Sequence, residues 1–220
     1  MQASVKLPNN KRSVVSKSKG KLPSYIIGID EAGRGPLAGP LSICAFTVSR
    51  EYSKIVLKRA GDSKQISEKN REEIFNEVVT FKKQKKCFFE VTLVSAKIID
   101  KKGISYAIRA GLKKSLEKVV KQINKKPAEV LVLMDGSLKA PEEYINQNTI
   151  IRGDSLVPVI GMASIMAKVT RDKHMRRLSK KYPKYGFEIH KGYGTKAHYG
   201  AIRRYGISEI HRKTWIKTVN

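Results

Sequence analysis

Acidic side chains stand at the ends of apolar segments in this sequence. Asp30 and Glu31 follow a β-branched apolar run, and Asp135 follows a continuous apolar run. Asp154 closes a third, shorter run. Ionised carboxylates at the end of a buried strand are costly in free energy unless a cation compensates for their lost hydration. The pattern therefore predicts that these four side chains share a cation site.

The chemistry of that site follows from its donor atoms. Four carboxylates without a histidine or cysteine neighbour form a hard oxygen donor set, which suits Mg²⁺ or Mn²⁺ rather than zinc. Two such ions about 4 Å apart activate a water and stabilise the leaving oxygen of an in-line displacement at phosphorus. The simpler interpretation of Asp135 and Asp154, taken singly, is turn formation beside glycine. Taken with Asp30 and Glu31, they favour a site for two Mg²⁺ or Mn²⁺ ions.

A sheet is needed to bring these acids together, because ligands bind beyond the carboxyl ends of strands in α/β proteins. The tight Gly-Pro connection after the first run favours antiparallel pairing with the second, and a run arriving from a helix favours parallel pairing. Successive strand side chains point to opposite faces, so Asp30 and Glu31 reach one centre only if the strand ends or bulges between them. Strands are expected at residues 25–29, 41–48, 88–94, 130–134 and 149–154.

Helical patterns fill the rest of an α/β chain. Ser67 is a candidate N-cap for a helix reaching residue 79. Apolar residues recur at helical spacing over residues 104–123, and small and apolar residues favour another helix over 161–181. We expect one catalytic domain at residues 23–220, with a small helical appendage from about residue 186. Residues 1–22 are basic without periodicity, which is typical of a flexible arm, either a solvated tail or a tether to nucleic acid.

Composition narrows the class of protein. The chain has 220 residues, enough for one sizeable core, and carries 45 Lys and Arg against 19 Asp and Glu, a formal charge of +26. Such a charge favours a polyanionic partner such as nucleic acid, although a genome-wide lysine bias would explain part of it. Cys44 and Cys87 lack metal or disulfide spacing and are expected to be reduced core thiols. Without a membrane span or a signal core, a soluble, monomeric, cytoplasmic protein is expected.

Residues 26–215 resemble ribonuclease HII, the type 2 ribonuclease H family. The blocks that carry the resemblance occur in the same order in this chain as in the family, and this shared order argues against a chance match. They are Gly28-Ile29-Asp30-Glu31-Ala32-Gly33-Arg34-Gly35-Pro36, Asp62-Ser63-Lys64, Asp135-Gly136, Gly153-Asp154, Ala163-Ser164-Ile165 with Ala167-Lys168-Val169 and Arg171-Asp172, His190-Lys191-Gly192-Tyr193-Gly194-Thr195, and His211-Arg212. The block after Arg212 departs from the family, because Thr214-Trp215 stands where Ser-Phe is commoner.

The resemblance implies a ribonuclease H-like α/β fold, with a mixed five-stranded sheet flanked by helices and a C-terminal helical extension. It implies endonucleolytic cleavage of the RNA strand in RNA-DNA hybrids, including incision 5′ of a single ribonucleotide in duplex DNA, as in ribonucleotide excision repair and DNA replication. The products would carry 5′-phosphate and 3′-hydroxyl ends. On the family pattern, the catalytic metal ligands are Asp30, Glu31, Asp135 and Asp154.

Nucleic-acid contacts are carried over in the same way. Gly33-Arg34-Gly35 matches the loop that senses the ribose 2′-hydroxyl, the one group that separates RNA from DNA at a given sugar. Tyr193 matches the aromatic that rests on the sugar of the following deoxynucleotide. Positioning contacts to phosphate are expected from Ser63, Lys64, Ser164 and Lys168, with a solvated surface charge for the lysines and a packing role for Ser164 as alternatives.

Other interpretations remain open on sequence alone. A type 3 ribonuclease H would prefer longer hybrids, usually with an extra N-terminal domain and a different fourth acid. A basic module that binds hybrids without cleaving them, and more weakly a phosphatase, are the rivals from other classes. The four histidines lack metal-site spacing and are expected to be structural or to lie near phosphate, and Asp172 is expected to pair with a cation or support the site from behind.

Overall fold

The computed structural model describes residues 25–60 and 65–216. Its centre is a mixed five-stranded sheet in the order β3-β2-β1-β4-β5. β1 pairs antiparallel with β2 and parallel with β4, and the outer pairs β2-β3 and β4-β5 are antiparallel and parallel respectively. The strands are β1 (Tyr25–Ala32), β2 (Leu41–Val48), β3 (Cys87–Val94), β4 (Val130–Asp135) and β5 (Gln147–Ile150). The expected sheet and both expected pairing directions are confirmed.

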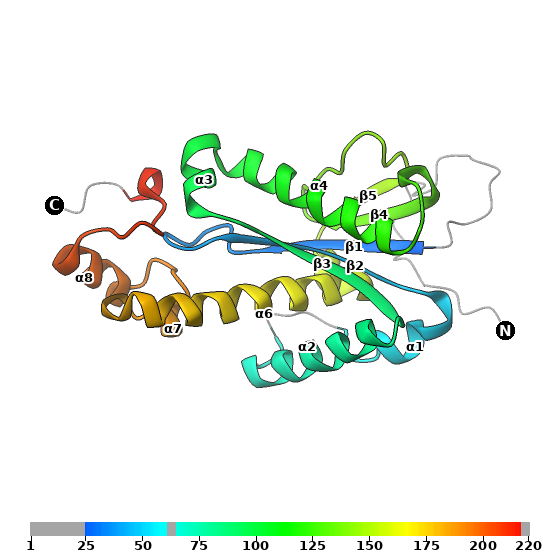
Figure 1. Cartoon of the computed structure of the whole chain (residues 1–220), viewed down its shortest axis with the longest axis horizontal. Helices are drawn as coiled ribbons and strands as arrows, with labels where there is room; N and C mark the ends of the chain where they lie inside the picture. The colour runs from blue at the N-terminus through cyan, green and yellow to red at the C-terminus, as the bar shows by residue number, and fades with distance from the viewer. Residues whose placement is uncertain (1–24, 61–64, 217–220) are drawn as a thin grey trace.

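Helices cover both faces of this sheet, with α3 and α4 on one side and α6, α2 and α1 on the other (Figure 1). Ser67 caps α2 by accepting the N–H of Asn70 at 3.2 Å, as the sequence predicts. The helices are α1 (Ser53–Val56), α2 (Glu68–Lys83), α3 (Ala96–Lys102), α4 (Ile104–Gln122), α5 (Gly153–Leu156), α6 (Pro158–Lys181), α7 (Phe187–His190) and α8 (Lys196–Tyr205). Single 3-10 turns lie at Arg50–Tyr52, Pro127–Glu129, Pro183–Tyr185 and Lys213–Trp215.

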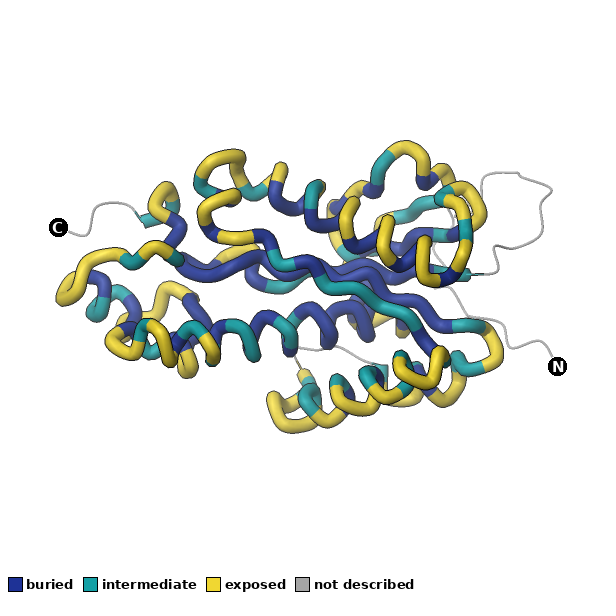
Figure 2. Tube along the Cα trace, in the orientation of Figure 1, coloured by how far each residue is buried: buried dark blue, intermediate teal, exposed yellow. Residues whose placement is uncertain are grey.

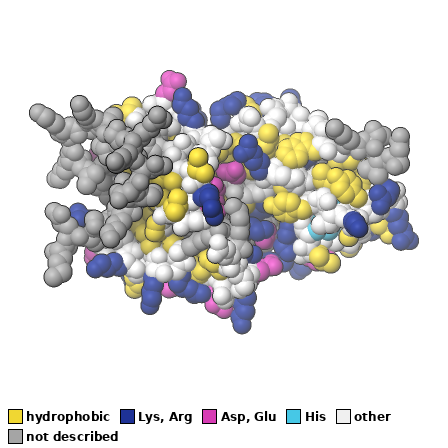
Figure 3. All heavy atoms as spheres, turned by 180° about the vertical axis from the view of Figure 1, so that it is seen from behind, with side chains coloured by type: hydrophobic (Ala, Val, Ile, Leu, Met, Phe, Trp, Pro, Cys, Tyr) yellow, Lys and Arg dark blue, Asp and Glu magenta, His cyan; other side chains and the backbone are white. Residues whose placement is uncertain are grey.

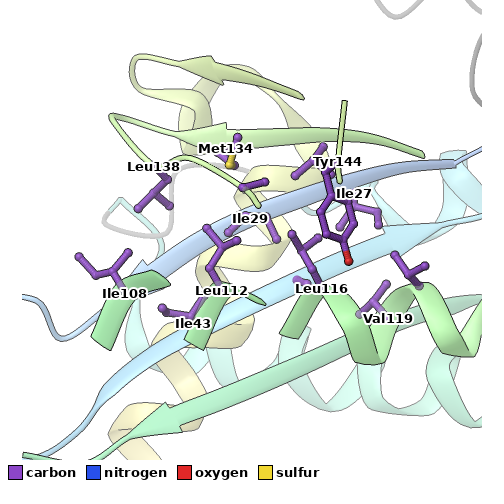
Figure 4. Close-up of a cluster of buried hydrophobic side chains, with 14 of the residues drawn as sticks. Ile27, Ile29, Ile43, Ile108, Leu112, Leu116, Val119, Met134, Leu138 and Tyr144 are labelled. Carbon is purple, nitrogen blue, oxygen red and sulfur yellow. The ribbon is translucent and has the colours of Figure 1, made fainter. Parts of the chain in front are cut away.

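The sheet separates two hydrophobic layers, and its β2 strand is buried along its whole length (Figure 2). On the α4 side, Leu112 and Leu116 pack against Ile27, Ile29 and Ile43 of the sheet (Figure 4). The second layer lies between the sheet and α6 and includes the free cysteines, Cys44 and Cys87, both buried as expected. Two independent layers hold β1 from both faces, so its carboxyl end is fixed in position.

α6 approaches β1 closely because β1 has no side chain at residue 28. A Cβ at Gly28 would lie 2.3 Å from the carbonyl carbon and oxygen of Val159. The helix then runs for 24 residues, past the end of the sheet and into the C-terminal part of the chain (Figure 1). It therefore connects the carboxyl end of β1 with the elements around α7 and α8.

Two local expectations differ from the structure. β1 neither ends nor bulges at the acid pair, because Asp30 and Glu31 stay in register with Cys44 and Ile43 of β2. The fifth strand ends at Ile150 rather than at an acid, and the left-handed Arg152 (φ 58°) turns the chain into α5. Asp154 therefore lies in a short helix, four residues beyond β5.

Three further expectations concern the rest of the chain. The predicted basic arm at residues 1–22 lies outside the described residues. The residues after 186 form α7, α8 and the last 3-10 turn, and their division from the catalytic domain as an appendage stays a prediction. In the part of the chain that the structure describes, no helix is both long and apolar enough to cross a bilayer.

Candidate active site

Asp30 lies near the carboxyl end of β1 and is almost fully buried. Only 6% of it is exposed, and its Oδ1 accepts the N–H of Glu31 at 2.8 Å. Loss of hydration raises the pKa of Asp30 from its ordinary 3.8 to about 7, against the lowering effect of a hydrogen bond from Ser164. The negative charges of Glu31 and Asp135 raise it further. A carboxylate in this environment is stabilised by any cation that reaches it.

A hydrogen bond from the backbone next to Asp154 holds the Asp135 side chain in place. It is the last residue of β4, and its Oδ1 accepts the N–H of Gly153 at 2.6 Å. Gly153 begins α5, and Asp154 follows it with 4% of its surface exposed. The Oδ1 of Asp154 accepts the N–H of Ser155 at 3.0 Å. One hydrogen bond therefore fixes the α5 segment, and Asp154 with it, against the end of β4.

The faces of the sheet decide which acids lie together. Asp30 lies on the α6 face, since it alternates with Ile29 and bonds to Ser164 of α6. Asp135 lies on that same face, because Met134 before it packs into the α4 layer. Glu31 follows the α4 face, and its Oε1 lies 3.8 Å from Nη1 of Arg34. Asp30 and Asp135 are therefore on one face, with Glu31 on the other and within electrostatic range.

These positions bear on metal binding. Among the described residues, no group of three or more His, Cys, Asp or Glu side chains is gathered closely enough to hold a metal ion. Alternation along the unbroken β1 strand accounts for this, because it separates Glu31 from Asp30. The donor set itself fits Mg²⁺ or Mn²⁺, since all the donors are carboxylate oxygens and the buried Asp30 carboxylate lacks hydration. Joint coordination by all four acids stays a prediction.

The loop after β1 holds the predicted Gly33-Arg34-Gly35 segment. Gly33 is buried with φ +88°, and a Cβ there would lie 2.0 Å from Nε of Arg171. Both the backbone conformation and the lack of space require glycine at residue 33. Arg34 and Gly35 are exposed. The loop therefore presents the Arg34 side chain beside Glu31, with a glycine on each side of it.

A stripe along α6 links Asp30 with Tyr193. Ser164, Lys168 and Arg171 recur at helical spacing on one side of α6. Ser164 bonds to Asp30, while Nζ of Lys168 lies 6.0 Å and the guanidinium of Arg171 5.7 Å from the Tyr193 ring centre. Tyr193 is 42% exposed, which leaves part of its ring free for a ligand. Asp30, Ser164, Lys168 and Tyr193, four of the predicted site residues, thus lie along one side of α6.

The residues predicted to contact phosphate are Ser63, Lys64, Ser164 and Lys168. Lys168 also forms an ion pair with Asp172 at 2.9 Å, in agreement with the ion-pair role expected for Asp172. Ser63 and Lys64 lie outside the described residues. Ser164 faces the Asp30 carboxylate, so its hydroxyl orients an acid in this structure.

Two arginines near the site received no role from the sequence. Arg171 and Arg212 are fully buried, with 0% of each exposed. Arginine is almost never fully buried unless its charge is paired, and both of these side chains reach the loop after β1. Both arginines lie in blocks that carry the family resemblance, and helical spacing also puts Arg171 on the stripe with Ser164 and Lys168. Neither signal gives Arg212 a role, because its contacts are with residues far away in sequence.

Three of the four histidines, His190, His198 and His211, form a buried cluster around Phe187. Nε2 of His198 and Nε2 of His211 are 3.1 Å apart, and the rings of His190 and His198 stack with centroids 4.4 Å apart. Burial lowers the pKa of His211 to about 4, and the neighbouring His198 lowers it further. Buried rings that contact one another suit a structural role, one of the two alternatives expected from the sequence.

Comparison with known proteins agrees with this geometry. The family model for ribonuclease HII matches residues 27–218. The ribonuclease HII of Caldicellulosiruptor bescii is 40% identical over 195 residues, which are 89% of this chain and 88% of that protein. The ribonuclease HII of Coxiella burnetii is 41% identical over 197 residues, 89% of this chain and 91% of that protein. The structure of the PCNA:RNase HII complex from Archaeoglobus fulgidus matches with a TM-score of 0.66 at 25% identity, covering 89% of this chain and 96% of that chain.

The match in three dimensions confirms the expected ribonuclease H-like fold. The match in sequence covers both strands that carry acids, the loop after β1, α6 and the segment around Tyr193. The chain therefore belongs to the ribonuclease HII family of metal-dependent endoribonucleases.

Proposed function

We propose that this protein hydrolyses the RNA strand of RNA-DNA hybrids and incises 5′ of single ribonucleotides embedded in duplex DNA. The products would carry 5′-phosphate and 3′-hydroxyl ends, with water as the nucleophile. The observation that carries the proposal is the pair of acids at the carboxyl ends of the neighbouring parallel strands β1 and β4. Asp30 and Asp135 interact electrostatically there, in the position where α/β sheets bind ligands.

Two Mg²⁺ or Mn²⁺ ions are proposed as cofactors, held by Asp30, Glu31, Asp135 and Asp154. Joint binding requires the Glu31 side chain to turn from the other face of β1 toward the remaining three acids. When bound, such ions activate a water and stabilise the leaving oxygen at phosphorus. Hydrogen bonds hold two of these carboxylates in place: Ser164 donates to Asp30, and the Gly153 N–H donates to Asp135. Those bonds orient carboxylates that would otherwise repel each other.

Selection for a ribonucleotide is assigned to the loop after β1. Gly33, Arg34 and Gly35 lie beside the acids, and backbone groups are well suited to sense a small hydroxyl at close range. Tyr193 offers an exposed ring to the neighbouring sugar, and Lys168 offers a cation to phosphate. Lys and Arg side chains are spread over the face seen in Figure 3, where acidic side chains are sparse, which favours a polyanion.

The cellular setting is part of the proposal. The protein would act as a cytoplasmic monomer in the removal of ribonucleotides from DNA during replication and repair. The archaeal relative was solved in a complex with PCNA, so a sliding clamp is the candidate protein partner to test by pull-down.

Incision of a defined duplex tests the proposed reaction. The substrate is duplex DNA with one ribonucleotide, incubated with Mg²⁺ or Mn²⁺, and the products are mapped at nucleotide resolution. Wild type should cut once, 5′ of the ribonucleotide, and Asp135→Asn should bind the duplex without cutting it. Glu117→Gln, which removes an exposed acid of α4, is the matched control and should cut normally.

The same assay separates the rival functions when it also includes an all-RNA hybrid strand and a binding measurement in EDTA. A type 3 enzyme would cut an all-RNA hybrid strand and leave the single ribonucleotide intact. A binding module without catalysis would show salt-dependent binding in EDTA and no incision with either metal. Either result would contradict the proposed function.

A further inference from the structure

The Arg212 side chain donates hydrogen bonds to backbone carbonyls of the loop after β1. Nη2 donates to the carbonyl of Gly33 at 2.6 Å and Nη1 to the carbonyl of Arg34 at 2.8 Å. Nε and Nη2 both donate to the carbonyl of Gly39, at 3.2 and 3.1 Å. The Trp215 ring lies 4.8 Å from the guanidinium, at the position where the chain departs from the family pattern. One planar side chain therefore joins both ends of the loop.

Arg171 holds the same loop at its far end only. Its Nε donates to the carbonyl of Pro40 at 2.9 Å, and its Nη2 donates to the carbonyl of Ala38 at 3.2 Å. It makes no hydrogen bond to residues 33–35 among the described residues, although its Nε is close to Gly33. Of the two arginines, therefore, only Arg212 hydrogen-bonds to Gly33 and Arg34 at the start of the loop.

Burying two like charges together is costly. Burial lowers the pKa of Arg212 to about 10, and the charge of Arg171 lowers it further. No carboxylate among the described residues forms an ion pair with either guanidinium. A loop that only had to be closed could use apolar packing instead, so the forked geometry of arginine is the feature that this position requires.

The geometry of the peptide unit explains what the fork does. In a planar trans peptide, the C=O of one residue and the N–H of the next point in opposite directions. The carbonyls of Gly33 and Arg34 point inward to Arg212, so the N–H groups of Arg34 and Gly35 point outward. Both residues are exposed, and neither N–H donates to another described group. Two adjacent N–H donors therefore point away from Arg212, on the exposed part of the loop.

We propose that Arg212 is a positioning residue for recognition of the ribose 2′-hydroxyl. By fixing the peptide units 33–34 and 34–35, it holds the two outward N–H groups in place for the hydroxyl and the adjoining phosphate. The proposal rests on the ribonucleotide substrate of the proposed function. Arg212 touches only the loop, so it acts through the backbone and not on the substrate.

Arg212→Lys tests the proposal, because lysine keeps the charge but cannot bridge the carbonyls of Gly33 and Arg34 with a fork. Steady-state incision of the single-ribonucleotide duplex gives kcat and KM. An all-DNA duplex of the same sequence, used as a competitor, gives a Ki for binding without the 2′-hydroxyl. We expect Arg212→Lys to lower kcat/KM by about tenfold or more, the loss typical of one or two misplaced hydrogen bonds, with the Ki unchanged.

Arg109→Lys is the matched control, since it makes the same change at an exposed arginine of α4, on the other face of the sheet from α6. It should leave kcat/KM and the Ki close to their wild-type values. Three results would overturn the proposal. Arg212→Lys could cut as well as wild type, its Ki could rise in parallel with the loss of kcat/KM, or Arg109→Lys could cause the same selective loss.

A second measurement does not depend on folding of the arginine variants. In the non-cutting Asp135→Asn protein, hydrogen exchange over residues 33–40 should slow on binding the ribonucleotide duplex and change little on binding the all-DNA duplex. Equal protection by both duplexes would refute the role of these amides. Failure of wild type to incise would instead refute the proposed function itself, so the two failures are distinguishable.

Discussion

Asp30→Asn should stabilise the metal-free protein at alkaline pH. Asp30 is 6% exposed, and burial raises its pKa from 3.8 to about 7. The folded state therefore binds the proton more tightly than the unfolded state does. The stability that this proton contributes is present below pH 3.8 and is lost as the pH rises through about 7.

The magnitude follows from the same two values. One pKa unit corresponds to about 1.4 kcal/mol, so a rise from 3.8 to about 7 costs the wild type on the order of 4 kcal/mol once Asp30 is ionised in both states. Asparagine cannot ionise, and its amide keeps a similar shape. The free energy of unfolding of Asp30→Asn relative to wild type should therefore increase by several kcal/mol between pH 4 and pH 8.

Urea denaturation in EDTA at several pH values measures this difference. Adding Mg²⁺ or Mn²⁺ at pH 8 should stabilise wild type more than Asp30→Asn, because a bound cation replaces the lost hydration of the carboxylate. Ser164→Ala should steepen the pH dependence, since its hydrogen bond lowers the pKa of Asp30. An Asp30→Asn protein whose relative stability in EDTA is the same at pH 4 and pH 8 would refute the argument.

Two further changes test the scaffold. Gly28→Ala should lower the free energy of unfolding by about 3 kcal/mol or more in urea denaturation, because its Cβ would lie 2.3 Å from the backbone of Val159. The control is Gly200→Ala in α8, where nothing lies within 4 Å of the added Cβ, and it should be neutral or stabilising. Equal losses of stability in the two variants would contradict the account. In an Asp30→Asn background, stability should fall as the pH drops from 6.5 toward 4, because burial lowers the pKa of His211 to about 4 and the unfolded state then binds more protons. His211→Gln should flatten that slope, and an unchanged slope would exclude His211 as its source.

The parts of the site that the sequence predicted are those with a local signal. Asp30 and Asp135 end apolar runs that form neighbouring strands, so their place at one edge of the sheet follows from strand length and connection type. Asp154 was expected at a strand end, and the left-handed conformation of Arg152 moves it into α5 instead. A left-handed conformation at a non-glycine residue is uncommon, so the sequence gives no reason to expect one at Arg152.

The parts that the sequence missed depend on distant contacts. Arg212 bonds to Gly33 across 179 residues, and Arg171 bonds to Pro40 across 131. Both arginines look like ordinary basic residues in a basic chain, because burial is decided by tertiary packing and not by neighbours in sequence. The same reason hides the pairing of Ser164 with Asp30, which requires the close approach of α6 to β1 at Gly28.

The central claim is that four carboxylates hold the divalent ions that hydrolyse a phosphodiester. A crystal of the protein with a ribonucleotide-containing duplex and Mn²⁺, measured at the manganese absorption edge, tests it most directly. The account predicts two anomalous peaks bordered by oxygens of Asp30, Glu31, Asp135 and Asp154, next to the phosphate 5′ of the ribonucleotide. Peaks bound elsewhere on the protein, or none beside Asp30 and Asp135, would contradict it.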